Sequence, residues 1–121
     1  MSKRILVVDD QEDNRRILRD LLSSVGYELI ESEDGAQAVV AAAAHQPDLI
    51  LMDIQMPILD GYDATRQIKA DPKLRAIPVI AVTSYALSGD EDKARAAGCD
   101  AYIAKPYSPR QLLARVREFL P

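Results

Sequence analysis

Ile5-Leu6-Val7-Val8-Asp9-Asp10 joins a run of four aliphatic residues to two consecutive carboxylates. The same change from apolar to polar occurs in Leu49-Ile50-Leu51-Met52-Asp53 and in Val79-Ile80-Ala81-Val82-Thr83. Near-continuous apolar runs of this length are typical of parallel strands that are covered on both faces. These three stretches are therefore predicted to be the central strands of a parallel sheet.

Two further short runs and a set of amphipathic stretches complete the pattern. Strands are predicted at residues 4–8, 28–32, 49–52, 78–82 and 101–104. A stretch with helical spacing of its apolar positions follows each strand. This alternation predicts an α/β fold of five βα units, with a doubly wound, five-stranded parallel sheet of order 2-1-3-4-5. The units occupy residues 1–121 as a single domain, with no effector domain expected.

The predicted helices carry start and stop signals. The first has an apolar stripe made of Ile17, Leu18, Leu21, Leu22 and Val25. Gly26 follows the stripe and is suited to a left-handed C-terminal cap. Caps of the other helices are predicted at Asp34, Asp60, Gly98 and Ser108. Asp34 and Ser108 are each followed three positions later by Gln, which is the spacing of a capping box.

Composition and charge exclude several classes of function. The 121 residues carry a net charge of −4, with no basic run and no Trp, so we expect no nucleic-acid partner. No apolar run approaches the roughly 20 residues of a transmembrane helix, and the N-terminus lacks the apolar stretch of a signal peptide. Because Cys99 is the only cysteine, a disulfide scaffold is excluded and a reducing compartment is favoured. We expect a cytoplasmic protein with no membrane partner.

Polar residues stand at the carboxyl ends of the predicted strands: Asp9, Asp10, Asp53, Thr83 and Lys105. In an open parallel sheet these ends share one rim, and a crevice opens where the strand order reverses. For the order 2-1-3-4-5, three carboxylates converge there. They repel one another unless they share a cation, and oxygen ligands suit Mg²⁺ or Mn²⁺. The hydroxyl and the ammonium suit a phosphoryl group beside that ion, so the site is predicted to carry out phosphoryl transfer.

Four spaced motifs give the chain a resemblance to a known family. They are Val7-Val8-Asp9-Asp10, Asp53-Ile54-Gln55-Met56-Pro57 with Asp60-Gly61, Ala81-Val82-Thr83-Ser84, and Tyr102-Ile103-Ala104-Lys105-Pro106. Together they resemble the receiver domain of two-component response regulators, over residues 3–120. The resemblance implies the flavodoxin-like, or CheY-like, form of the fold. Residues 48–55 and 98–103 are similar to single-domain regulators of the DivK type.

The resemblance implies a switch that is set by phosphorylation. Asp53 would accept a phosphoryl group from a phosphohistidine on a histidine kinase or a histidine phosphotransfer protein. Asp10 and Asp53 would bind Mg²⁺ directly, together with the backbone carbonyl of Gln55. Asp9 would act mostly through water, and Lys105 would pair with the phosphoryl oxygens.

The resemblance also implies how the switch is read. The Thr83 hydroxyl would move to bind a phosphoryl oxygen, and Tyr102 would turn inward into the space that Thr83 leaves. The peptide bond before Pro106 would be cis. A downstream protein target would bind the face formed by the fourth helix, the fifth strand and the fifth helix. That face is expected to include Arg95, Ala97, Tyr102, Arg110 and Leu113.

Several alternatives remain open at this point. An aspartate-nucleophile phosphatase would use the same metal chemistry, but it would want a second acid where Gln55 stands, and a cap over its substrate. A flavodoxin-like cofactor binder would need a phosphate loop where Asp9-Asp10-Gln11-Glu12 would repel phosphate. A receiver that is never phosphorylated usually lacks part of the acidic set, whereas a receiver excised from a larger hybrid histidine kinase fits equally well. His45 is expected on the surface, and Cys99 as a small packed residue.

Overall fold

The computed structural model describes residues 3–54, 56, 59–83 and 90–121. Its strands are β1 (Arg4–Val8), β2 (Glu28–Ser32), β3 (Leu49–Asp53), β4 (Val79–Thr83) and β5 (Ala101–Ala104). Its helices are α1 (Glu12–Ser24), α2 (Gly35–His45), α3 (Gly61–Ala70), α4 (Asp90–Ala97) and α5 (Pro109–Phe119). In the described part of the chain, no helix is long and apolar enough to span a bilayer.

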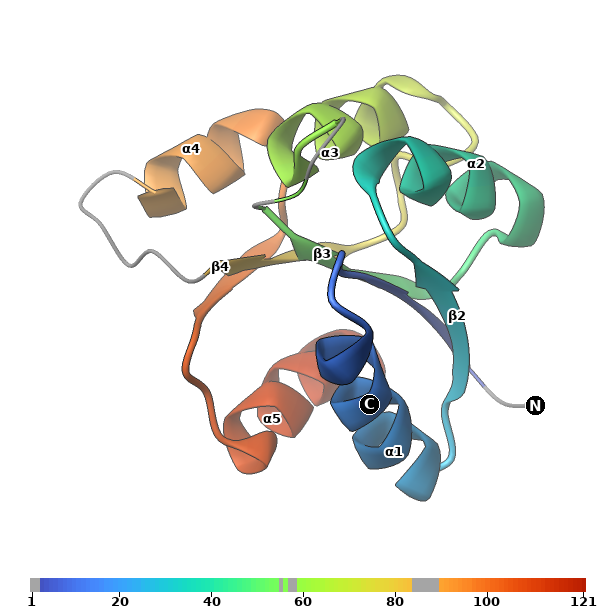
Figure 1. The fold of residues 1–121 in the computed structure, drawn as a ribbon. Coiled ribbons are helices and arrows are strands. Elements are labelled where there is room, and N and C mark those ends of the chain that lie inside the picture. Colours follow the sequence, from blue (N-terminus) through green and yellow to red (C-terminus); the bar gives the residue numbers. More distant parts are fainter. Residues whose placement is uncertain (1–2, 55, 57–58, 84–89) are drawn as a thin grey trace.

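The five strands lie parallel in one sheet, in the order β2-β1-β3-β4-β5. Figure 1 shows α1 and α5 below the sheet and α2, α3 and α4 above it. The predicted fold and strand order are therefore confirmed. Because β1 lies between β2 and β3, the direction of winding reverses beside β1, which is where a ligand crevice forms in such sheets.

The sheet separates two apolar cores, because successive residues of a strand point to opposite faces. In β1, Leu6 and Val8 pack against the layer of α2, α3 and α4, while Ile5 and Val7 pack against α1 and α5. Every residue of β3 and β4 is buried. The central strands read as continuous apolar runs because both of their faces are covered.

β3 and β4 each extend one residue beyond their predicted ends. Asp53 and Thr83 are thus the last residues of strands, not the first residues of loops. Pairing with the neighbouring strand continues through both positions, since Asp53 lies opposite Val82 and Thr83 lies opposite Ala104. The sheet itself therefore holds the backbone of two predicted site residues.

The predicted apolar stripe of the first helix is wrong at two positions. Leu18 and Leu22 are buried, but Ile17 is 61% exposed and Val25 is 39% exposed. Arg15 is buried instead, at 6% exposure, and it shares one face of α1 with the two buried leucines. A charged side chain therefore occupies an inward position of α1, and Ile17 lies on the surface.

The helix caps follow the predicted signals with one difference. Ser108 begins α5 with a complete capping box, in which Gln111 returns the hydrogen bond. The carboxylate of Asp34 accepts from the backbone N–H of Gln37 (2.8 Å), but the Gln37 side chain accepts from Glu33 and not from Asp34. Left-handed backbone follows α1 at Gly26 (φ +95°), α2 at Gln46 (φ +45°) and α4 at Gly98 (φ +105°).

Candidate functional site

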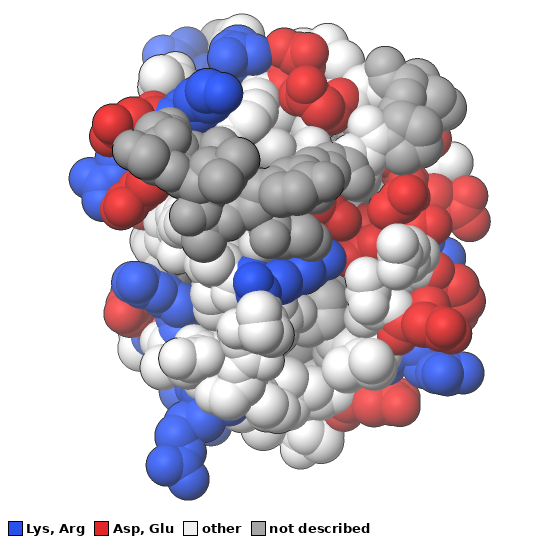
Figure 2. Space-filling view, turned by 60° about the vertical axis from the view of Figure 1, so that its left-hand side comes forward, with Lys and Arg blue, Asp and Glu red and all other residues white. Residues whose placement is uncertain are grey.

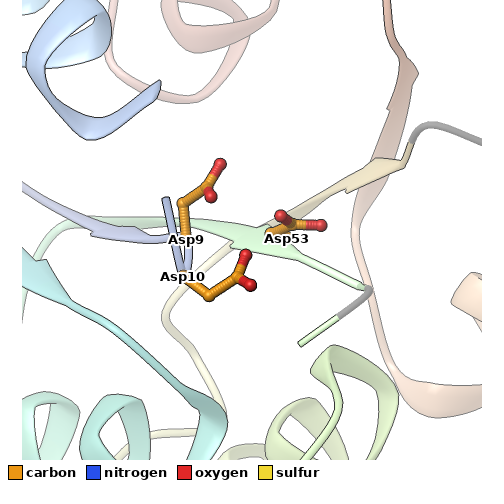
Figure 3. Close-up of side chains that lie close together, drawn as sticks. All are labelled: Asp9, Asp10 and Asp53. Carbon is orange, nitrogen blue, oxygen red and sulfur yellow. The ribbon is translucent and has the colours of Figure 1, made fainter. Parts of the chain in front are cut away.

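Three carboxylates meet at the reversal point of the sheet. Asp9 and Asp10 follow β1, and Asp53 ends the adjacent strand β3. One carboxylate oxygen from each lies within 4.8 Å of the others. Figure 3 shows the three side chains gathered at the ends of these strands, with the carboxylate of Asp10 directed toward Asp53. The predicted convergence of the carboxylates is confirmed.

Asp9 and Asp53 are buried, at 3% and 6% exposure, whereas Asp10 is exposed. Lys105 follows β5, and its Nζ lies 3.5 Å from Oδ2 of Asp9 and 3.6 Å from Oδ2 of Asp53. The other carboxylate oxygen of Asp9 accepts from the backbone N–H of Gln11 (2.9 Å). One ammonium thus faces two buried carboxylates, and the cluster as a whole keeps an excess of negative charge.

The donor set fits a hard divalent cation. All three side chains offer oxygen, and Asp10 keeps one side of the cluster open to water. Mg²⁺ prefers a few carboxylates and several waters to a closed protein cage, and three carboxylates with one exposed member leave room for such waters. The predicted ligand Gln55 lies outside the described residues.

Thr83 and Tyr102, the predicted switch residues, lie on neighbouring strands. Thr83 is 1% exposed at the end of β4, and its carbonyl accepts from the backbone N–H of Lys105 (2.7 Å). Tyr102 is partly buried in β5 and packs against the core on the side of α2, α3 and α4. The Lys105–Pro106 peptide bond is cis. Thr83, which ends β4, and Lys105, which follows the adjacent strand β5, therefore both stand at the carboxyl ends of neighbouring strands.

The sequence did not predict that Ile17 and Tyr107 lie beside the site. A cavity of about 310 Å³ is lined by Asn14, Ile17, Lys105, Pro106 and Tyr107. Burial, followed by the negative charges of Asp9 and Asp53, raises the pKa of the Tyr107 hydroxyl. Ile17 was assigned to the core from its spacing, and nothing in the local sequence marks Tyr107, because both positions depend on how α1 packs beside the loop that follows β5.

The face expected to bind a downstream target stays a prediction, and one of the residues expected on it is buried. Arg95 and Arg110 are exposed, and Tyr102 and Leu113 are partly buried, but Ala97 is buried at 3% exposure. Figure 2, which brings the side of α4, β5 and α5 forward, shows acidic side chains gathered to the right and a largely uncharged area across the lower centre. As expected, His45 is exposed and Cys99 is buried.

Fold and site together define a doubly wound α/β domain that holds a carboxylate cluster and a lysine at its strand ends. Residues 5–117 match the response regulator receiver domain, and the chain belongs to that family. It is 45% identical over 120 residues to the polar-differentiation response regulator DivK of Brucella ovis, covering 99% of this chain and 98% of that protein.

Solved receiver domains have the same fold. The receiver domain of the sensor histidine kinase PA1611 of Pseudomonas aeruginosa PAO1, with a magnesium ion coordinated in its active site cleft, superposes with a TM-score of 0.92. It is 38% identical, and the match covers 99% of this chain and 98% of that one. The receiver domain of a signal transduction histidine kinase of Syntrophus aciditrophicus superposes with a TM-score of 0.92 at 34% identity, covering 98% and 90% of the two chains.

Proposed function

We propose that this protein is a single-domain response regulator that accepts a phosphoryl group on Asp53 and signals by binding other proteins. The observation that carries the proposal is the placement of Asp53. It is buried at the end of β3, with Asp9 and Asp10 within 4.8 Å and the Lys105 ammonium 3.6 Å away. An ammonium at this position can stabilise the negative charge that develops on the phosphoryl oxygens during transfer.

In the proposed reaction a carboxylate oxygen of Asp53 forms a bond to phosphorus. The P–N bond of a phosphohistidine breaks, and its electron pair stays on the imidazole nitrogen. Lys105, whose Nζ lies 3.6 Å from Asp53, would pair with the phosphoryl oxygens, and the hydroxyl of Thr83 at the end of β4 would bind one of them. Asp10, Asp53 and the Gln55 carbonyl would hold Mg²⁺, with Asp9 acting through water, and the ion would supply positive charge beside the phosphoryl group.

The surface beside Asp53 favours a protein as phosphodonor. Ile17 is 61% exposed and lines a cavity together with Lys105 and Tyr107, so an apolar contact is available next to the lysine that reaches Asp53. We propose that a histidine kinase or a histidine phosphotransfer protein covers Ile17 while its phosphohistidine approaches. A small-molecule donor would not need that contact.

The stand-alone form of the domain is supported by its relatives. The match to DivK covers 98% of that protein. The receiver domains of PA1611 and of the Syntrophus aciditrophicus kinase belong to histidine kinases, so a receiver from a hybrid kinase is the second candidate. A switch is favoured over an aspartate-nucleophile phosphatase because Gln stands two residues after Asp53, where such an enzyme would want an acid. The cytoplasmic location and the lack of a nucleic-acid partner stay predictions.

Intact mass tests the phosphoacceptor. With acetyl phosphate and Mg²⁺ the mass should rise by one phosphoryl group, about 80 Da. Asp53→Asn should show no increase, while Asp13→Asn, which removes an exposed carboxylate on α1, should behave like the wild type. An Asp53→Asn variant that still gains about 80 Da would place the phosphorylation elsewhere.

The kind of donor is tested by comparing two variants. Ile17→Ser should slow phosphorylation by a cognate histidine kinase or phosphotransfer protein and leave the rate with acetyl phosphate unchanged. Val40→Ser is the matched control, because Val40 is 69% exposed on α2, a helix of the opposite layer. Equal rates for Ile17→Ser and Val40→Ser with the protein donor would contradict the proposed contact.

A further inference from the structure

Arg15 is a charged residue in a position that a leucine or isoleucine would ordinarily take. Its side chain is 7% exposed, and it shares the inner face of α1 with Leu18 and Leu22. Burial of a guanidinium is costly unless its N–H groups are bonded and its charge is paired. The hydrogen bonds and ion pairs of Arg15 should therefore show why a guanidinium is buried at this position.

Four acceptors surround the Arg15 guanidinium. Nη1 donates to the backbone carbonyl of Asp9 (2.7 Å), and Nη2 donates to the carboxylate of Glu12 (2.6 Å). Nε donates to Glu31 of β2 (3.3 Å), and Nη2 lies 3.8 Å from the carboxylate of Glu33. Three carboxylates neutralise the charge, and the one hydrogen bond to a neutral acceptor is directed at the residue that begins the carboxylate cluster.

The Asp9 carbonyl belongs to the same planar peptide unit as the backbone N–H of Asp10. Three other contacts already hold Asp9, since its N–H donates to Ser32 (3.1 Å), one carboxylate oxygen accepts from Gln11, and the other lies 3.5 Å from Lys105. Asp10, in contrast, is exposed. The bond from Arg15 orients the peptide unit from which Asp10 extends toward Asp53.

We propose that Arg15 is a positioning residue for the divalent-cation site: its hydrogen bond to the Asp9 carbonyl orients Asp10, so that the three carboxylates are arranged for the ion before it binds. This inference rests on the proposed function, because it assigns a role toward the ion that Asp10 and Asp53 would hold. Partners of this kind, which orient metal ligands without touching the metal, commonly change metal affinity 10–100-fold when they are replaced.

A purely electrostatic role and a positioning role of Arg15 predict opposite changes in Mg²⁺ affinity when Arg15 is replaced. If only its charge acted on the site, loss of a positive charge would leave the surroundings more negative, and Mg²⁺ would bind more tightly. If Arg15 positions Asp10, Arg15→Met weakens Mg²⁺ binding, by about tenfold in Kd. Arg15→Lys keeps the charge but lacks the planar fork that serves the Asp9 carbonyl and the glutamates together, so it should weaken binding too.

Arg19 offers a matched control. It donates to Glu31 (2.8 and 2.9 Å) and to Glu12 (3.2 Å), two of the glutamates that bind Arg15. Among the described residues, Arg19 makes no hydrogen bond to Asp9. Arg19→Met therefore removes a positive charge beside two of these glutamates and leaves the hydrogen bond from Arg15 to the Asp9 carbonyl in place. Its Kd for Mg²⁺ should stay within about twofold of the wild-type value, since only screened charge changes.

The experiment is a calorimetric titration with MgCl₂ of the wild type, Arg15→Met, Arg15→Lys and Arg19→Met, each checked for folding by thermal unfolding. NMR of the metal-free proteins gives a second readout, because loss of the bond to the Asp9 carbonyl should shift the Asp10 amide resonance in the two Arg15 variants and not in Arg19→Met. The initial rate of phosphorylation by acetyl phosphate should also recover in the Arg15 variants as Mg²⁺ is raised, because a higher concentration restores occupancy of the ion site.

The outcomes separate the two proposals. Weaker Mg²⁺ binding in both Arg15 variants, a shifted Asp10 amide and unchanged binding in Arg19→Met support the positioning role. Binding in Arg15→Met that equals or exceeds that of the wild type, or an equal loss in Arg19→Met, overturns it while the cation site stands. A wild type that does not bind Mg²⁺ overturns the proposed site, and the role of Arg15 with it. If Arg15→Met does not fold, Arg15→Lys decides the question in the same way.

Discussion

Lys105 places one ammonium between two buried carboxylates, Asp9 and Asp53, and leaves Asp10 to the solvent side. Three carboxylates against one ammonium give the cluster an excess negative charge. Without a cation this excess costs folding free energy, because each added carboxylate is repelled by the others. Sites of this kind commonly reduce stability in exchange for function.

Asp10→Asn should therefore raise the melting temperature of the metal-free protein at neutral pH. With carboxylate oxygens within 4.8 Å of one another, repulsion in a partly solvated site is on the order of 1 kcal/mol, or about 3–5 °C for a domain of this size. Differential scanning calorimetry measures the change. Asp13→Asn, on the exposed side of α1 and 3.5 Å from Arg16, is the control and should not raise it. A lower melting temperature for Asp10→Asn would show that repulsion among the carboxylates does not destabilise the metal-free protein.

Gly61 links the start of α3 to the end of β3. A Cβ at this position would meet the backbone carbonyl oxygen of Asp53 and the Cα of Ile54, at 2.8 Å from the latter. Gly61→Ala should destabilise the protein by about 1–3 kcal/mol, because backbone must move to admit the methyl group. It should also weaken Mg²⁺ binding, since the part that moves carries Asp53.

Chemical denaturation and Mg²⁺ titration of Gly61→Ala check both effects. Gly26→Ala is the comparison: a Cβ there has no neighbour within 4 Å, but the φ of +95° strains it, so it should cost stability and leave Mg²⁺ affinity unchanged. If Gly61→Ala were as stable as the wild type, the backbone at Asp53 and Ile54 would have to move aside without loss of folding free energy, which contradicts this prediction.

At the scale of elements, α1 is tied to the edge strand β2 by Arg19 and Glu31. Hydrogen bonds from Arg19 hold the pKa of Glu31 below its ordinary value of 4.5, against the desolvation that would raise it. The folded-state pKa is depressed, so the stabilisation is present above pH 4.5 and is lost as the pH falls through the folded-state pKa. The contribution is modest, because solvent screens the charges of two partly exposed side chains.

Arg19→Met should accordingly lower the free energy of unfolding at pH 7, with a difference from the wild type that shrinks below about pH 4.5. Urea unfolding across the pH range measures it. Arg95→Met is the control, because its partner Glu91 lies on the same helix and both side chains are well exposed (72% and 57%), so its effect should be near zero at every pH. A difference for Arg19→Met that persists undiminished at low pH would assign the effect to packing and not to the ion pair.

At the scale of the whole molecule, the sheet connects the carboxylate cluster to the proposed output face. Thr83 pairs with Ala104 across β4 and β5, and Tyr102 lies two residues earlier on β5. A change at Thr83 can therefore reach β5 through one strand pair. Phosphorylation would shift the population between two arrangements of this edge, and it would not require a change in the strand order.

Beryllofluoride, a phosphoryl mimic, should shift the amide resonances of Tyr102 and of residues in α4 and α5, and leave Val40 on α2 unshifted. Two-dimensional NMR of the wild type with Mg²⁺ measures the response, and Asp53→Asn under the same conditions should show none. Shifts confined to Asp9, Asp10 and Asp53 would contradict transmission to the output face.

The sequence alone determined the class of fold and the composition of the site. Four-residue apolar runs that end at carboxylates, as in 5–10 and 49–53, already require parallel strands covered on both faces, and chain topology then brings their carboxyl ends to one edge. Caps at Asp60 and Ser108 were readable because capping is a local interaction between residues three positions apart.

Only the tertiary structure decided which side of α1 is buried and what supports the carboxylates. Ile17 and Arg15 lie on the same amphipathic helix, and the apolar spacing predicts that Ile17 points inward. Arg15 is buried instead, because the carbonyl of Asp9 and three glutamates, from α1, from β2 and from the segment after β2, bind its guanidinium. The close approach of Gly61 to Asp53 and the position of Tyr107 are likewise decided by contacts between elements. Periodicity records that a helix has an apolar side, but the rotation of that helix depends on partners far away in the chain, which local sequence does not encode.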